Sequence, residues 1–274
     1  MITGASAGIG RATALALAGQ GATLFLVCRD RARGEQTIAD IRRHTGSDRA
    51  HLLLADLSSQ QSIRQLARDF LASRSPLHVL VNNAGVVNTR RTVTVDGLET
   101  VFAVNHLAYF LLTQLLLDRL KESAPARIVN VASDAHRFGT MNFDDLGGER
   151  RYRPMRIYGQ SKLANVLFTY ELARRLEGSK VTVNCLHPGS VSTGLGANNG
   201  ALARVVIGLL RPFFRTSEQG AATSVSLASA AEVEGISGKY FRDCREVRSS
   251  KASYDLAAAQ RLWELSERMT GVSR

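Results

Sequence analysis

The chain has 274 residues, 45% of them hydrophobic, and a formal net charge of +11 at pH 7. This apolar share is enough for a substantial core, and we expect one domain over residues 1–274. The start shows no basic segment followed by an apolar run, and no apolar run reaches the roughly 18 to 20 residues that a bilayer requires. The arginines are scattered rather than gathered in a tail or stripe, so we do not expect nucleic-acid binding. We therefore expect a cytoplasmic protein, and its three widely separated cysteines predict no metal site.

Apolar runs alternate with amphipathic stretches along the whole chain. The expected elements, in chain order, are a helix at 11–19, a strand at 22–27, a helix at 31–44, a strand at 49–57, a helix at 59–73, a strand at 77–85, a helix at 97–121, a strand at 126–133, a helix at 158–177, strands at 180–189 and 238–241, and a helical tail at 254–270. Continuous apolar strands separated by helices are typical of a parallel sheet buried on both faces. The pattern predicts an α/β fold with a doubly wound parallel sheet.

The first ten residues, MITGASAGIG, hold the pattern T-G-x-x-x-G-x-G at Thr3, Gly4, Gly8 and Gly10. Glycines so placed let a backbone approach a phosphate at the start of a helix. A strand normally precedes such a loop and runs about 5–6 residues, but only Met1 and Ile2 stand before Thr3. A missing central strand leaves buried N–H and C=O groups unpaired, at roughly 1–3 kcal/mol each. We therefore expect the first strand to be truncated and the natural start to lie upstream.

The second predicted strand ends at Cys28, where an NAD-binding protein usually has an acidic residue for the ribose hydroxyls. The next residue, Arg29, could instead pair with a 2′-phosphate, which favours NADP. Two alternatives remain open here. Arg29 could be a solvated loop residue, and Asp30 could serve NAD if the strand ends two residues later.

Tyr158 and Lys162 are four residues apart and share one face of a predicted helix. A nearby ammonium stabilises a phenolate, so we expect Lys162 to lower the pKa of Tyr158 and to enable proton exchange with a carbonyl or alcohol oxygen. Ser133 ends a predicted strand at the edge where ligands bind in such sheets. Asn105 is a polar residue in an apolar helix, either a core side chain bonded to backbone or the holder of a water near the lysine.

Together these motifs resemble the short-chain dehydrogenase/reductase superfamily over nearly the whole chain. Segments such as CRDRARGE, YGQSKLANVLFTYELARRLEG and RLWELSERMTG are similar to its retinol dehydrogenase-like branch. The resemblance implies a Rossmann-like fold and a catalytic set of Asn105, Ser133, Tyr158 and Lys162. It also implies that NADP(H) is bound by Gly4, Ser6, Gly8, Ile9, Gly10, Arg29, Asp56, Leu57, Asn83, Ala84, Gly85, Tyr158, Lys162, Pro188, Gly189, Val191 and Thr193.

The implied function is an NADP(H)-dependent oxidoreductase that interconverts a lipophilic carbonyl compound, such as a retinal-like aldehyde, and its alcohol. In this hypothesis Tyr158 exchanges the proton, Ser133 polarises the carbonyl and Asn105 holds a relay water. The alternatives are a non-catalytic dinucleotide-binding regulator of the same fold and a truncated inactive product. Relatives commonly pair through the helices at 97–121 and 158–177, so a homodimer or homotetramer is expected.

The stretches 134–157 and 194–216 are least dictated by shared motifs, so substrate choice is expected to lie there. Residues 194–216 are apolar with arginines at the rim, including Arg204, Arg211 and Arg215. Such a segment suits a lid over a lipophilic substrate or a peripheral membrane contact, and equally a plain packing helix. We expect His136 and His187 to form local hydrogen bonds rather than to act as catalysts.

Overall fold

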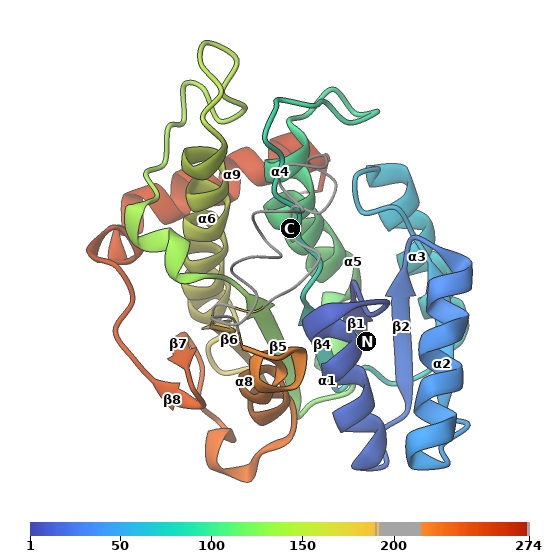
Figure 1. Ribbon diagram of the computed structural model, residues 1–274. Coiled ribbons are helices and arrows are strands. Elements are labelled where there is room, and N and C mark those ends of the chain that lie inside the picture. The colour runs from blue at the N-terminus through green and yellow to red at the C-terminus, as the bar shows by residue number, and fades with distance from the viewer. Residues whose placement is uncertain (190, 192–214, 273–274) are drawn as a thin grey trace.

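The computed structural model describes residues 1–189, 191 and 215–272, and its strands form one sheet in the order β3-β2-β1-β4-β5-β6-β7-β8 (Figure 1). The strands are β1 Ile2–Thr3, β2 Leu24–Cys28, β3 Ala50–Leu54, β4 Val79–Asn82, β5 Ala126–Val131, β6 Val181–His187, β7 Lys239–Arg242 and β8 Arg245–Glu246. All neighbouring strands are parallel except β7 and β8. The predicted doubly wound, Rossmann-like sheet is confirmed.

Helices cover both faces of this sheet. They are α1 Gly8–Gly19, α2 Arg31–Thr45, α3 Gln60–Ala72, α4 Thr100–Phe102, α5 Ala108–Glu122, α6 Pro154–Arg175, α8 Ser217–Ser229 and α9 Leu256–Thr270. Short turns add η1 Ala103–Leu107, η2 Asp134–Phe138, η5 Ala231–Val233 and η6 Lys251–Tyr254. Helices α1, α2 and α8 pack on one face, and α3, α5 and α6 on the other. Helix α8 has no counterpart among the sequence predictions.

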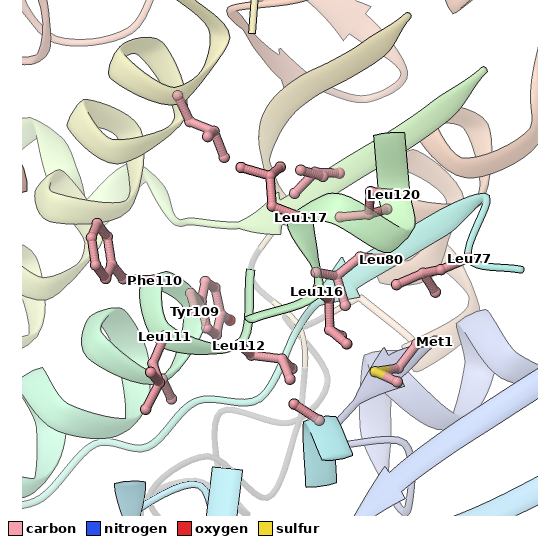
Figure 2. Packing of buried hydrophobic residues seen from close by; sticks show 14 of the residues in the cluster. Met1, Leu77, Leu80, Tyr109, Phe110, Leu111, Leu112, Leu116, Leu117 and Leu120 are labelled. Atoms are coloured by element: carbon pink, nitrogen blue, oxygen red, sulfur yellow. The ribbon is translucent and has the colours of Figure 1, made fainter. Parts of the chain in front are cut away.

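Successive side chains of a strand point to opposite faces of the sheet, so neighbouring residues belong to two separate cores. Leu80 and Ile128 face α3, α5 and α6, whereas their neighbours Val81 and Val129 face α1, α2 and α8. Figure 2 shows the first of these cores, with Leu80 and Leu116 directed into one cluster. Because both faces are covered, apolar residues stand at consecutive positions in the central strands, as at Leu80 and Val81, rather than only at alternate positions.

Strand β1 is as short as the sequence indicates, yet it lies at the centre of the sheet. Ile2 pairs with Leu26 of β2 and with Val81 of β4. The amino group of Met1 donates to the carbonyl oxygen of Val79 at 2.7 Å, and burial lowers the pKa of this amino group to about 5. The Met1 side chain belongs to the core shown in Figure 2. A natural start upstream of Met1 stays a prediction.

The helix expected at 97–121 is interrupted by one wide turn. Residues Ala103–Leu107 form a π-helical turn, in which the amide of Ala108 donates to the carbonyl of Ala103 five residues earlier. The segment Thr100–Glu122 is long and apolar enough to span a membrane, but 89% of its apolar window is buried inside the protein. Its hydrophobicity is therefore accounted for by packing in the core.

Helix α9 packs against α6 and the π-turn, and Figure 1 shows it in red beside them. Its residues Ala259 and Leu262 share a cluster with Phe102 of α4 and Leu163 of α6. Trp263 lies 5.0 Å from the Phe110 ring of α5, measured between ring centroids. Part of the helical surface expected to pair between subunits is thus covered within the chain. Both the oligomeric state and the cytoplasmic location stay predictions.

Leu116→Ala should lower the free energy of unfolding by about 2–5 kcal/mol, because the deletion leaves a cavity in the core. Leu116 is 0% exposed, whereas Leu256 on α9 is 59% exposed and offers a matched control. Leu256→Ala should change the same quantity by about 0.5 kcal/mol or less. Urea unfolding followed by circular dichroism measures both, and equal losses in the two variants would contradict the core assignment.

Stability should also fall in acid because of His106, which is fully buried in the π-turn. Burial lowers the pKa of His106 from 6.5 to about 4. Below pH 6.5 the unfolded chain binds a proton at His106, whereas the folded protein does not bind this proton until the pH falls to about 4. Stability is therefore full above this window and is lost as the pH falls through it, by up to about 3 kcal/mol.

Urea unfolding of the wild type and of His106→Gln between about pH 7 and about pH 4.5 tests this expectation. In His106→Gln the free energy of unfolding should fall less steeply as the pH is lowered. In the control His78→Gln, at an exposed position, it should fall as steeply as in the wild type. The same slope in all three proteins would refute the assignment to His106.

Candidate active site

The predicted site residues gather at the carboxyl edge of the sheet. The glycine loop follows β1, residues 83–85 follow β4, Ser133 follows β5, and residues 188–189 follow β6. Helix α6 adds Tyr158 and Lys162. This edge is where open α/β sheets bind ligands, and the parallel strands bring together segments far apart in the sequence.

The glycine loop depends on close backbone approach. A Cβ atom on Gly10 would lie 2.3 Å from the Gly4 carbonyl oxygen and 2.5 Å from Nδ2 of Asn83. Gly4 itself has a φ of +66°, a conformation that side chains disfavour. Asn83 fixes the loop by donating from Nδ2 to the Thr3 carbonyl at 2.8 Å. The predicted glycines are thus required for the contact between the β1 and β4 ends.

Helix α1 begins in this loop without a side-chain cap. Its N-cap residue is Ala7, whose methyl group accepts no hydrogen bond. Gly8 and Ile9 open the helix, so their amide groups are directed toward the loop crevice. Uncapped amides at a helix start attract anions, and the arrangement fits the pyrophosphate of a dinucleotide.

Strand β2 ends at Cys28, as the sequence predicts. Asp30 accepts a hydrogen bond from the Arg33 amide at 3.0 Å and thereby caps α2. Its carboxylate is engaged by the backbone, whereas Arg29 is exposed at the strand end. The cationic side chain therefore remains at the strand end where the sequence predicts contact with a 2′-phosphate, and this contact stays a prediction. Ser6 of the glycine loop is a hydrogen-bond partner of the buried Cys28 thiol.

The residues expected at the adenine end lie just after β3. Asp56 accepts from the Ser58 amide at 2.9 Å and from the Ser58 hydroxyl at 2.7 Å. Leu57 is partly buried against the core on the α3 side. Both lie at the carboxyl edge with the glycine loop, and their contact with adenine stays a prediction.

Ser133 and Tyr158 lie within hydrogen-bonding reach of each other through their hydroxyl groups. Lys162 is 4% exposed, and its Nζ donates to the Val131 carbonyl at 3.0 Å. The same Nζ lies 5.7 Å from the centroid of the Tyr158 ring. The three groups expected to act together are therefore brought together by β5 and α6.

The electrostatics of this pair differ from the sequence expectation. Burial raises the pKa of Tyr158, although the hydrogen bond with Ser133 lowers it. Burial also lowers the pKa of Lys162 to about 7. The expected lowering of the Tyr158 pKa by Lys162 is wrong for the protein by itself, because desolvation favours the uncharged form of both groups.

Asn105 lies in the π-turn and is completely buried. Its Oδ1 accepts from the Val86 amide at 2.7 Å, while Nδ2 donates to the Val86 carbonyl and to the Ser161 hydroxyl, each at 3.0 Å. A Cβ atom on Gly85 would lie 3.4 Å from this Oδ1 and 3.6 Å from the Lys162 Nζ. Asn105 thus has the backbone contacts of a core asparagine and also flanks the lysine. Its role toward a relay water stays a prediction.

Both histidines form the local hydrogen bonds that we expected. His136 bonds the Ser133 carbonyl through Nδ1 at 2.7 Å, and its Nε2 accepts from the Ser250 amide at 3.0 Å. His187 Nδ1 accepts from the Asp134 amide at 3.2 Å. Because a backbone amide can only donate, Nε2 of His136 carries no proton. His136 therefore holds the backbone of Ser133 by donating from Nδ1 to its carbonyl oxygen.

Two further residues escaped the sequence analysis. Tyr109 donates to the Ala84 carbonyl at 2.8 Å, and its ring centroid lies 6.0 Å from the Lys162 Nζ. Asp134 accepts from Tyr240 at 3.0 Å and pairs with Arg242 at 3.3 Å. The partners named here come from distant parts of the chain, so no local pattern marks these contacts.

The loop after β6 contributes Pro188 and Gly189, and Gly189 has a φ of +85°. A Cβ atom on Gly189 would lie 2.7 Å from the Arg215 side chain. Val191 and Arg215 pair in an isolated parallel bridge. Arg215, expected at an arginine rim, is paired with Asp243. Thr193 and almost all of the predicted lid at 194–216 lie outside the described residues.

Comparisons with known proteins agree on one family. The profile of the short chain dehydrogenases matches residues 1–202. Retinol dehydrogenase 12 of Mus musculus is 47% identical over 272 residues, covering 99% of this chain and 86% of that protein. Retinol dehydrogenase 14 of Homo sapiens is 45% identical over 288 residues, with 99% and 86% covered.

Solved structures give the same result. An uncharacterised protein from Mycobacterium paratuberculosis has a TM-score of 0.80 and 34% identity, covering 99% of this chain and 92% of that one. A short chain dehydrogenase from Burkholderia cenocepacia, solved in complex with NADP, has a TM-score of 0.67 and 27% identity, with 88% and 93% covered. The chain therefore belongs to the short-chain dehydrogenase/reductase family, in its retinol dehydrogenase-like branch, and is an oxidoreductase acting on CH–OH groups.

Proposed function

We propose that the protein is an NADP(H)-dependent oxidoreductase that interconverts a lipophilic aldehyde or ketone and its alcohol, with Tyr158 as the proton donor and acceptor. One observation carries this proposal. The Tyr158 hydroxyl lies within hydrogen-bonding reach of Ser133, and Tyr158 stands one helical turn before the buried Lys162, at the edge that holds the glycine loop. A protein that only binds a dinucleotide has no need of this proton-transfer set.

The cofactor fits the residues at this edge. The bare backbone of Gly4 and Gly10 and the uncapped start of α1 suit a pyrophosphate. The engagement of Asp30 by the α2 backbone leaves Arg29 to meet a 2′-phosphate, which supports NADP over NAD. A Burkholderia relative solved with NADP supports the same choice. When bound, the nicotinamide supplies the hydride, which no protein side chain provides.

The side chains supply position and a proton. In the direction of reduction, the Tyr158 hydroxyl donates its proton to the carbonyl oxygen, and in oxidation the phenolate takes the alcohol proton back. Ser133 orients the same oxygen through its own hydroxyl. Lys162, with a pKa lowered to about 7 by burial, exchanges protons near neutral pH and can return one to Tyr158. Asn105 holds the π-turn against Val86 and α6, which keeps these groups in register.

Two exposed apolar side chains support a lipophilic substrate. Phe138 is 55% exposed at the end of η2, and Met155 is 56% exposed in the first turn of α6. Phe138 packs over Gly159, the residue after Tyr158, where a Cβ atom would meet the ring at 2.9 Å. The names of the retinol dehydrogenases among the relatives point to the same class of substrate.

The experiment that tests the proposal follows NADPH fluorescence on binding and then its consumption with a panel of apolar aldehydes and ketones. Consumption supports the proposed function. Binding without consumption would favour a regulatory dinucleotide-binding protein, and absence of binding would favour an inactive product.

Tyr158→Phe should abolish turnover because it removes the transferable proton, while the dissociation constant for NADPH stays within about twofold. Tyr254→Phe provides a matched control, since Tyr254 lies outside the site and stacks on Tyr170. Steady-state kinetics and fluorescence titration measure the two quantities. Turnover retained by the Tyr158 variant would rule out its assigned role.

Arg29→Ala should weaken NADPH binding by about 10- to 100-fold, the usual effect of losing a hydrogen bond to a charged group. Binding of NADH, which lacks the 2′-phosphate, should hardly change. Arg68→Ala on α3 serves as the control, because the Arg68 guanidinium donates to Gln65 of its own helix and lies away from β2. Equal losses for the two nucleotides would show that Arg29 does not read the 2′-phosphate.

A further inference from the structure

We propose that Ser266 of α9 is a positioning residue for the active site, acting through His106 on the π-turn that carries Asn105. This inference rests on the proposed reductase activity for its kinetic part only. The Ser266 side chain lies far from the glycine loop in sequence and makes no contact with the catalytic hydroxyls. A change at Ser266 would therefore reach the active site through the buried side chain of His106.

The contact between α9 and the π-turn is a buried hydrogen bond of defined polarity. The Ser266 Oγ lies 2.9 Å from Nε2 of His106, and the same hydroxyl donates its proton to the Leu262 carbonyl at 2.8 Å. A hydroxyl has one proton, so toward His106 the Ser266 oxygen must accept. His106 therefore carries a proton on Nε2, and its ring is 0% exposed. Because burial lowers the pKa of His106 to about 4, the ring is neutral at pH 7.

On its other sides His106 faces aromatic rings and lies within hydrogen-bonding reach of Asn165 in α6. Its ring centroid lies 5.1 Å from that of Phe102 in α4 and 6.0 Å from that of Phe168 in α6. These apolar contacts leave Ser266 as the acceptor of the Nε2 proton. Removing the Ser266 hydroxyl would leave a buried donor without its partner, and the π-turn would lose its polar anchor to α9.

The neighbouring residue in the same turn faces the active site. Successive residues of a helix point about 100° apart, so His106 contacts α9 while Asn105 reaches Val86 and Ser161. The Ser161 hydroxyl in turn donates to the Tyr158 carbonyl at 2.8 Å. A continuous set of hydrogen bonds and one helical turn thus connects α9 with the catalytic tyrosine.

The π-turn makes this connection sensitive to register. A π-helical turn carries one residue more than an α-helical turn over the same rise, and such turns often occur at functional sites. If the turn relaxed to α-helical spacing by one residue, the direction of Asn105 would change by about 100° relative to the helix that follows. The hydrogen bonds of Asn105 on one side and of His106 on the other oppose that relaxation.

Helix α9 is itself a firm support. Its carboxyl end receives Gln60 of α3, whose Nε2 donates to the Met269 carbonyl at 2.8 Å, and Arg64, which donates to the Thr270 carbonyl. The Trp263 ring lies under the Arg175 guanidinium at 4.1 Å from the ring centroid. Contacts with α3, α5 and α6 fix Ser266 relative to the sheet.

The test compares Ser266→Ala with Thr270→Val. Thr270 is 2% exposed on the same helix, and within the described residues its hydroxyl bonds to the Ser266 and Glu267 carbonyls of α9. Both variants remove a buried hydroxyl, but only the first disturbs the π-turn. We expect kcat of Ser266→Ala to fall on the order of tenfold or more, since small misplacements of catalytic groups are costly. KM for NADPH should stay within about twofold, and Thr270→Val should keep the wild-type kcat.

A double-mutant cycle with His106→Phe separates positioning from general loosening. If Ser266 acts through His106, the double variant should have about the kcat of the more impaired single variant. Losses that multiply would mean that the two residues act independently, and they would overturn the proposal. Wild-type kcat in Ser266→Ala would overturn it as well.

Hydrogen exchange supplies a readout that needs no activity. The amides of residues 103–108 should lose protection in Ser266→Ala and keep it in Thr270→Val. If the wild type consumes no NADPH while this difference is present, the proposed function fails and the positioning role stands. Equal protection in the two variants would refute the positioning role whatever the activity.

Discussion

The active site depends on the amide group of one asparagine that joins three elements of the fold. Asn105 accepts from and donates to the backbone of Val86, beyond β4, and donates to Ser161 of α6. It does so from a π-turn at the start of the α5 helix. Because it is completely buried, each of these hydrogen bonds lacks competition from water. The Asn105 side chain therefore helps to fix the β4 loop, the π-turn and helix α6 relative to one another.

Desolvation is the second constraint, and it acts on both members of the proposed proton-transfer pair, Tyr158 and Lys162. It raises the pKa of Tyr158 and lowers that of Lys162 to about 7, so burial favours the neutral form of each. A lysine with a pKa near 7 changes its charge near neutral pH, whereas an exposed lysine would remain an ammonium ion. An ionic group bound beside this pair would therefore shift its protonation. The Ser133 hydroxyl opposes the shift of Tyr158 and connects the pair to β5.

The sequence predicts those parts of the site that follow from local patterns. Tyr158 and Lys162 are one helical turn apart, Cys28 ends an apolar run, and the glycines of the first loop precede a helix, so each could be placed from its neighbours alone. The π-turn could not be predicted, because a wide turn leaves no mark in apolar periodicity. The bond between His106 and Ser266 joins residues 160 positions apart, and two such residues are unremarkable until the chain is folded. The pKa of Tyr158 was misjudged for a related reason, since burial is a property of the fold rather than of the spacing.

The carboxylate partners of the arginines differ along this edge of the sheet. Near Ser133, Arg137 and Arg242 share the single carboxylate of Asp134. At the end of β2, the Asp30 carboxylate accepts a hydrogen bond from the α2 backbone, and the Arg29 side chain is exposed. An exposed arginine keeps its positive charge available to an anionic group in solution. Such a group would therefore be drawn to the β2 end of this edge, away from the hydroxyls of Ser133 and Tyr158.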